Sequence, residues 1–228
     1  MTAVTSDVRF RRIITLHSIC TSIYTSFIIF ILVYTHKIYE IGKRSSLPVI
    51  GVLIVGECLK VVFRPFTSET STKEKQNKPK KFNLSSKLKC ALVLCTSIVI
   101  YYCLAVLFGA PFLSSHEETF MFALLLTVLT VLPSCLAVGA DVTIAILIDL
   151  TSFEGDIITE TIKQNICVTL VGAWLGAVVI PLDWDRPWQA WPIPCSLGAV
   201  IAYMCSNLFN IVGMSSKTLK KKTGRYNL

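Results

Sequence analysis

The sequence of 228 residues has few charged side chains and few histidines. Charged residues make up 16% of it and apolar residues 53%, whereas an ordinary soluble domain has about 25% and about 45–50% of these. Intrinsic disorder is excluded, because disordered chains have low hydrophobicity. The 11 glycines and 9 prolines are too few for a collagen-like chain. The shortage of charge and the apolar excess together favour a membrane protein.

Paired cysteine spacings and catalytic motifs are also missing. The nine cysteines form no Cys-x-x-Cys pair and nearly all lie in apolar runs, so we interpret them as packing residues. His17, His36 and His116 are widely scattered, although metal-assisted phosphoryl transfer needs several carboxylates or histidines held together. Neither a glycine-rich phosphate loop nor a Gly-x-Ser-x-Gly elbow occurs. We therefore expect no catalytic residue, no cofactor and no metal site.

Six apolar segments have about the length of a membrane-spanning helix, which takes roughly 17–25 residues. They are residues 13–34, 47–63, 88–108, 120–140, 162–180 and 193–212. The sequence therefore predicts an all-α, polytopic membrane helix bundle of about six transmembrane helices, in a single membrane domain, 1–228. A further apolar stretch, 142–150, is too short to span, and both an interfacial and a re-entrant position remain open for it.

The distribution of Lys and Arg predicts the orientation. Counted over the loops and the two ends, 16 of these residues fall on the side that holds both termini and 4 on the other. By the positive-inside rule, both termini are cytosolic, together with the basic loop 64–87 and the basic tail 213–228. The net charge of +8 is thereby explained by topology, and we do not expect nucleic acid as a partner.

The second segment is the weakest because it contains Glu57 near its middle and Lys60 three residues later. A charge at the centre of a spanning helix costs about 2.5–3.5 kcal/mol on the insertion scale. The spacing places both side chains on one helix face, where pairing with each other or with a neighbour reduces this cost. We interpret Glu57 as structurally partnered and Lys60 as extending to the basic flank. A functional path remains open, because intramembrane charges commonly mark functional sites.

Residues 171–194, which we call the Trp-Pro hairpin, contain all four tryptophans and four of the nine prolines. Gly172 and Gly176 have the Gly-x-x-x-Gly spacing that lets two membrane helices approach closely. If the loop that follows is a helical turn with Asp185 as its N-cap, its three tryptophans share one face. Both an aromatic belt at the lipid headgroups and a docking surface for a protein remain open for these tryptophans.

The Trp-Pro hairpin, which reads VGAWLGAVVIPLDWDRPWQAWPIP, resembles the phosphatidylinositol-glycan biosynthesis class F family of small multispanning proteins. Two upstream pieces agree with it, Phe108-Gly109-Ala110-Pro111 and Glu118-Thr119-Phe120. The resemblance covers roughly the second half of the chain. The motif is specific because it is long and rich in tryptophan and proline.

The resemblance implies a non-catalytic subunit of the endoplasmic reticulum membrane, in contact with membrane lipid. It would bind and stabilise two alternative large multispanning enzymes, the ethanolamine phosphate transferases that act on mannoses of the glycosylphosphatidylinositol (GPI) anchor precursor. We expect these partners to bind at Gly172, Trp174, Gly176, Pro181, Asp183, Trp184, Arg186, Pro187, Trp188, Trp191 and Pro192. The alternative is a small intramembrane lipid-handling enzyme or transporter that uses Glu57 and Lys60, or Asp183 and Asp185.

Overall fold

The computed structural model describes residues 2–68, 84–111, 114–150, 156–182, 184 and 186–223. Within these residues the chain forms seven α-helices and three short 3-10 helices, and no strand. The α-helices are α1 (Thr2–Tyr34), α2 (Leu47–Ser68), α3 (Leu84–Leu107), α4 (His116–Val138), α5 (Ala140–Ile148), α6 (Ile157–Ala177) and α7 (Ile193–Thr223). The 3-10 helices are η1 (Ile38–Glu40), η2 (Arg44–Ser46) and η3 (Pro187–Gln189). The prediction of an all-α fold is confirmed.

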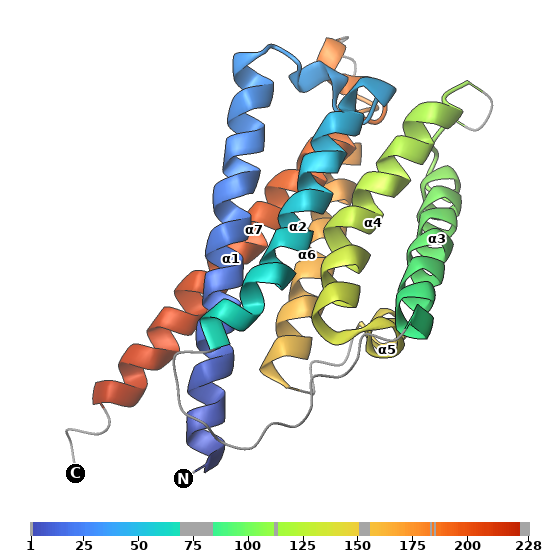
Figure 1. Cartoon of the computed structure of the whole chain (residues 1–228). Helices are drawn as coiled ribbons and strands as arrows, with labels where there is room; N and C mark the ends of the chain where they lie inside the picture. Colours follow the sequence, from blue (N-terminus) through green and yellow to red (C-terminus); the bar gives the residue numbers. More distant parts are fainter. Residues whose placement is uncertain are drawn as a thin grey trace.

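The six long helices run along the axis of one bundle, and α5 lies across one of its ends (Figure 1). The start of α1 and the end of α7 lie at this same end, which we call the terminal end. The 3-10 helices lie at the opposite end, which we call the hairpin end. The apolar stretch predicted at 142–150 forms α5, and its nine residues are too few to span a bilayer.

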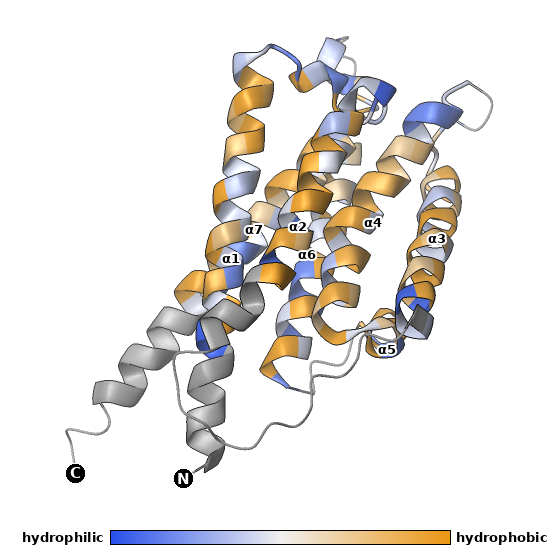
Figure 2. Cartoon of the chain, viewed as in Figure 1, coloured by the Kyte–Doolittle hydropathy of each residue, from blue (hydrophilic) through white to orange (hydrophobic). Residues whose placement is uncertain are grey.

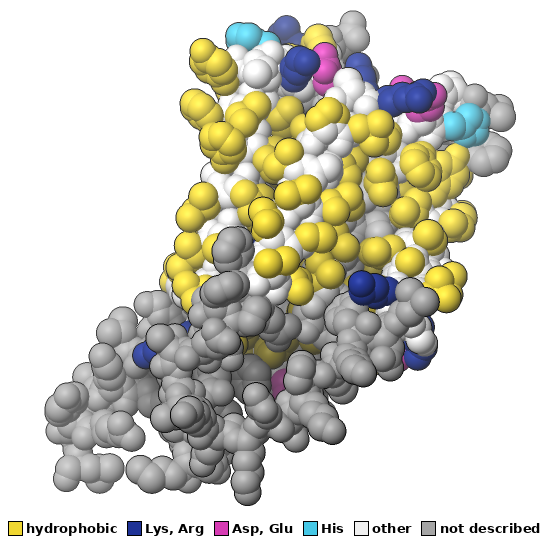
Figure 3. Space-filling view, in the orientation of Figure 1, with side chains coloured by type: hydrophobic (Ala, Val, Ile, Leu, Met, Phe, Trp, Pro, Cys, Tyr) yellow, Lys and Arg dark blue, Asp and Glu magenta, His cyan; other side chains and the backbone are white. Residues whose placement is uncertain are grey.

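On the face of the bundle shown in Figures 2 and 3, the described side chains between the two ends are largely apolar. Five helical segments are long and apolar enough to cross a membrane: Arg11–Tyr34, Arg44–Val62, Ser85–Leu107, His116–Val138 and Ile193–Gly213. These findings confirm a membrane helix bundle. The fifth predicted span, 162–180, lies mostly on α6, which is less apolar because Lys163, Gln164 and Asn165 occupy its first half. A crossing by α6 and the orientation of the termini stay predictions.

The predicted basic segments are only partly described. Residues 69–83 of the loop 64–87 lie outside the described residues, and α2 continues to Ser68 before them. The tail expected from residue 213 begins as helix, since α7 continues to Thr223. These helix extensions lengthen the bundle at its terminal end (Figure 1).

Helix α4 is the centre of the bundle, and α3 lies at its edge. In α4, 72% of the apolar span is buried, against 22% in α3. The hydroxyls on α4 bond within the helix: Thr127 donates to the Ala123 carbonyl and Thr130 to the Leu126 carbonyl. A polar side chain can therefore lie in this apolar core without an unsatisfied donor.

Helices α6 and α7 form a close contact through glycine. A Cβ placed on Gly172 would lie 2.2 Å from the Ala202 Cβ, and one on Gly198 would lie 2.2 Å from the Gly172 carbonyl oxygen. On Gly176 it would lie 2.2 Å from the Pro194 carbonyl oxygen. The Gly-x-x-x-Gly pair of α6 therefore contacts α7 of the same chain. We expected Gly172 and Gly176 to bind a partner, and the structure places α7 of the same chain against this face; binding of a partner there stays a prediction.

Candidate functional site

The Trp-Pro hairpin is fixed by a side chain that the sequence analysis did not single out. Gln189 is 7% exposed and lies in η3. Its Oε1 accepts a hydrogen bond from the Arg186 backbone N–H at 2.9 Å, and its Nε2 donates to the carbonyls of Val179 and Leu182, both at 2.8 Å. The N-cap of η3 is Arg186 rather than Asp185. The sequence did contain a signal for this contact: Pro187 begins the turn and Gln189 is its third residue, the position from which a glutamine side chain bonds back to the N-cap backbone.

The tryptophans of the loop do not share one face. Trp191 points into the bundle, where its Nε1 donates to Thr119 Oγ1 at 3.1 Å and its ring meets Phe122 edge to face at 5.3 Å. Trp184 lies against Trp188 at 5.9 Å and is 57% exposed. The expectation of a common face is wrong because η3 is only three residues long.

The loop between α1 and α2 closes over the end of the Trp-Pro hairpin. Gly42 has a φ of +83°, and a Cβ there would lie 2.6 Å from Pro192 Cγ and 2.8 Å from Ser196 Oγ. Only glycine combines this backbone conformation with such a close approach. Pro192 is therefore covered by the chain itself.

The expected partner-binding residues thus fall into two groups. Gly172, Gly176, Trp191 and Pro192 contact other parts of the chain. The members that stay on the surface are Trp174, Pro181, Trp184, Arg186 and Pro187, with Trp188 half-buried. Asp183 and Asp185 lie outside the described residues.

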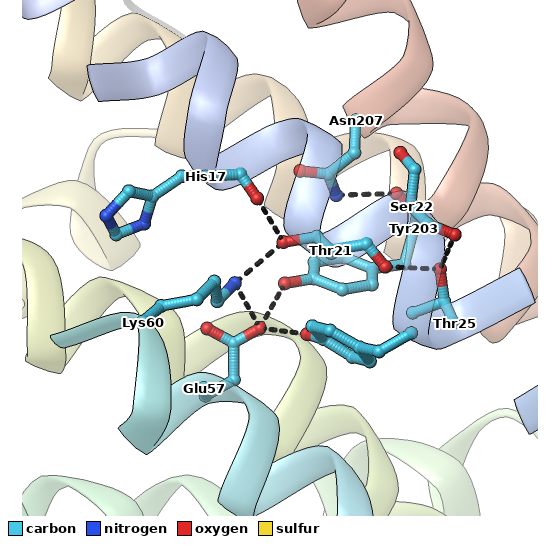
Figure 4. Close-up of polar contacts among 9 residues, drawn as sticks. His17, Thr21, Ser22, Thr25, Glu57, Lys60, Tyr203 and Asn207 are labelled. Carbon is cyan, nitrogen blue, oxygen red and sulfur yellow. Dashed lines mark hydrogen bonds and ion pairs between the residues drawn. The ribbon is translucent and has the colours of Figure 1, made fainter. Parts of the chain in front are cut away.

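A second polar site lies deep in the bundle around Glu57, which is 4% exposed. One carboxylate oxygen, Oε1, accepts hydrogen bonds from the Tyr24 hydroxyl, from Lys60 Nζ at 2.7 Å and from the Tyr203 hydroxyl at 2.9 Å. Lys60 Nζ also donates to Thr21 Oγ1 at 2.7 Å (Figure 4). We call Thr21, Tyr24, Glu57, Lys60 and Tyr203 the Glu57 cluster; it joins α1, α2 and α7.

The predicted pairing of Glu57 with Lys60 is confirmed as an ion pair. The interpretation that Lys60 extends to the basic flank is wrong, because its side chain is 8% exposed and bonds inside the bundle. The partners Tyr24 and Tyr203 were missed. Tyr203 is 146 residues from Glu57 in sequence, and local spacing carries no information about such a contact.

A cavity of about 110 Å³ adjoins the Glu57 cluster. Five helices line it, and about half of its lining residues are polar, including His17, Ser18, Asn165 and Asn207. Among the side chains that the structure describes, no group of three or more His, Cys, Asp or Glu residues is placed to hold a metal ion. The cavity is therefore a polar space with one ion pair at its wall.

Comparisons with known proteins give a consistent result. The model of the family described as "GPI biosynthesis protein family Pig-F" matches residues 6–211. The chain is 34% identical over 157 residues to a Homo sapiens protein named "GPI ethanolamine phosphate transferase, stabilizing subunit", and the match covers 67% of each chain. A Mus musculus protein of the same name is 36% identical over 133 residues, which cover 55% of this chain and 59% of the mouse protein.

A third relative is matched over most of its length. The Yarrowia lipolytica protein named "Glycosylphosphatidylinositol anchor biosynthesis protein 11" is 32% identical over 207 residues, which cover 85% of this chain and 84% of that protein. No solved structure matches the chain. The family match includes the Trp-Pro hairpin and the Glu57 cluster, and it extends the likeness into the first half, where the sequence analysis found no motif.

Proposed function

The chain belongs to the Pig-F family of GPI biosynthesis proteins, and we propose that it is a non-catalytic membrane subunit that binds and stabilises ethanolamine phosphate transferases acting on mannoses of the GPI anchor precursor. The observation that carries the proposal is the family match over residues 6–211, together with the names of the human and mouse relatives. We place the chain in the endoplasmic reticulum membrane, where it would serve two alternative catalytic subunits.

Such a subunit acts through binding alone. A protein that binds the folded transferase and not the unfolded one stabilises it by about 2.7 kcal/mol at a concentration 100 times the dissociation constant. This effect needs a complementary surface and no reacting group. The chain then controls the amount of transferase rather than its chemistry.

The exposed face at the hairpin end suits this binding. Trp174 on α6 is 59% exposed, and Val171, Leu175 and Val178 beside it are each more than half exposed. Trp184 adds a second exposed indole just beyond α6. Tryptophan is enriched where interfaces gain most of their binding energy, and membrane helices associate mainly through packing. We propose that a transmembrane helix of the transferase packs on this face.

Co-purification in a mild detergent tests the proposal. We expect a catalytic subunit to come with the full chain, and the double substitution Trp174→Ala and Trp184→Ala to lower both its recovery and its abundance in cells. Phe30→Ala is the matched control, because Phe30 is also an aromatic residue that is mostly exposed, at 65%, and it lies on a different helix, α1. Catalytic-subunit abundance that is unchanged when the chain is deleted would overturn the function. Loss with deletion but not with the double substitution would move the docking face elsewhere.

A further inference from the structure

Only one of the two oxygens of the Glu57 carboxylate accepts hydrogen bonds from described residues. All three donors of the Glu57 cluster bond to Oε1, and no described residue donates to Oε2. In Figure 4 this second oxygen lies on the side of Lys60 and His17. An ionised carboxylate accepts at two oxygens, so a side chain that is 4% exposed carries an unused acceptor.

This oxygen borders the cavity. The fully enclosed side-chain oxygens that lack a partner in the described part of the chain are Ser22 Oγ and Ser196 Oγ. Glu57 Oε2 is not among them, so open space lies beside it, and the cavity lined by Glu57, Lys60 and His17 supplies that space. The cavity is therefore a candidate binding site, since the buried carboxylate of Glu57 presents to it an oxygen atom that accepts no hydrogen bond from a described residue.

The wall of the cavity also offers a donor. The Lys60 ammonium has three N–H donors, and two acceptors are found for it among the described residues, Thr21 Oγ1 and Glu57 Oε1. The two charges of the wall cancel each other. A ligand with a net charge would leave that charge uncompensated in the bundle, which is costly; a group that carries both signs, or neither, leaves the site neutral.

The position and the volume of the cavity further limit which ligands it could bind. Its walls include Ile13, Ile158 and Ala137, which lie near the terminal end of α1, α6 and α4. This end belongs to the headgroup level if the bundle spans a bilayer. The volume of about 110 Å³ is well above the roughly 10–15 Å³ that one water needs, so the space admits a group larger than a single water.

We propose that this cavity binds the headgroup of a zwitterionic phospholipid that bears a primary ammonium. The ammonium donates to Glu57 Oε2, and the phosphate lies toward Lys60. The apolar residues at the wall, such as Ile14 and Ile162, contact the methylene and glycerol carbons. This site is separate from the transferase-binding face, and its lipid does not depend on the partner.

Thermal unfolding of the full chain, stripped of lipid in detergent, tests the ammonium contact. We expect short-chain phosphatidylethanolamine to raise the unfolding midpoint at a concentration at least about tenfold lower than phosphatidylcholine, whose quaternary ammonium has no N–H. Tenfold is the ratio given by loss of one hydrogen bond to a charged group. Free phosphoethanolamine distinguishes binding of the headgroup alone from binding of the whole lipid. If it raises the unfolding midpoint as much as the lipid does, the headgroup alone is recognised. If it raises the midpoint less, the rest of the lipid contributes to binding. Equal shifts with phosphatidylethanolamine, phosphatidylcholine and phosphatidylinositol would overturn the proposal.

A substitution that fills the cavity locates the binding. Ala137→Leu adds side-chain atoms at the cavity wall and replaces no residue of the Glu57 cluster, so we expect it to abolish the phosphatidylethanolamine shift. Ala91→Leu, the same change at an exposed position of α3, should keep the shift. A full shift in Ala137→Leu would place the lipid elsewhere and overturn the site. Recovery of the transferase with Ala137→Leu tests the proposed function separately.

Discussion

Two interfaces that share α7 are built from opposite kinds of residue. The contact of α6 with α7 uses Gly172, Gly176 and Gly198, where the backbones meet because side chains are absent. The contact of α7 with α1 and α2 uses the Glu57 cluster, where long polar side chains converge on one carboxylate oxygen. Lipid tails are as apolar as leucine, so membrane helices are held by packing and by hydrogen bonds rather than by hydrophobic burial.

The stability of the two interfaces is therefore sensitive to different kinds of substitution. A glycine contact depends on shape, and any added atom disturbs it. The Glu57 cluster depends on charge balance, so that removal of one charge matters more than removal of both. Substitutions at each interface test this difference. The quantity compared is the change in the free energy of unfolding, measured by denaturant titration in detergent micelles.

Glu57→Gln has the largest expected effect. It leaves the Lys60 ammonium without its counter-charge in a side chain that is 8% exposed, and removal of one partner from a buried pair costs about 3–5 kcal/mol. The amide oxygen still accepts from Tyr24 and Tyr203, so the loss reports the charge rather than the hydrogen bonds. The free energy of unfolding should fall by this amount.

The double variant Glu57→Gln, Lys60→Met is the control for charge balance. It removes both charges and should recover most of the stability lost in Glu57→Gln, because no uncompensated charge is then left in the bundle. A double variant as unstable as the single one would show that the polar cluster is held by shape, as the glycine contact is.

Gly176→Ala has the second-largest expected loss in the free energy of unfolding. The added Cβ would lie 2.2 Å from the Pro194 carbonyl oxygen and 2.8 Å from the Cys195 Cα, which are backbone atoms that cannot rotate away. Overpacking of this kind costs about 1–3 kcal/mol, and α7 must shift to relieve it. A free energy of unfolding equal to that of the wild type would contradict the close approach of α6 and α7.

Trp191→Phe has a smaller expected effect, because it changes one hydrogen bond and keeps an aromatic ring. The Nε1 donor to Thr119 Oγ1 is lost, while Thr119 still donates to the Ser115 carbonyl. A loss of about 1 kcal/mol is expected for one neutral hydrogen bond. Trp184→Phe is the control, since Trp184 is 57% exposed; an equal loss there would mean that burial of Trp191 is unimportant.

The features that were predicted correctly from the sequence depend on residues that lie close together along the chain. Apolar runs gave the long helices, and three-residue spacing gave the Glu57–Lys60 pair. The Gly-x-x-x-Gly spacing indicated a close helix contact but carried no information about which helix would fill it, and Gly198 of α7 fills it. The tryptophans were placed on one face by assuming helical periodicity, whereas the chain turns into the bundle at Trp191 after three helical residues.

Gly51→Ala sharpens the comparison with the smallest effect and the opposite sign. Gly51 lies on α2, and nothing lies within 4 Å of a Cβ placed there. Alanine in a helix interior is more favourable than glycine by about 0.5–1 kcal/mol, because the unfolded chain loses less freedom on folding. The free energy of unfolding should therefore rise slightly. A loss of stability at Gly51 as large as that at Gly176 would mean that glycine serves helix flexibility throughout the bundle, rather than the approach of α6 to α7.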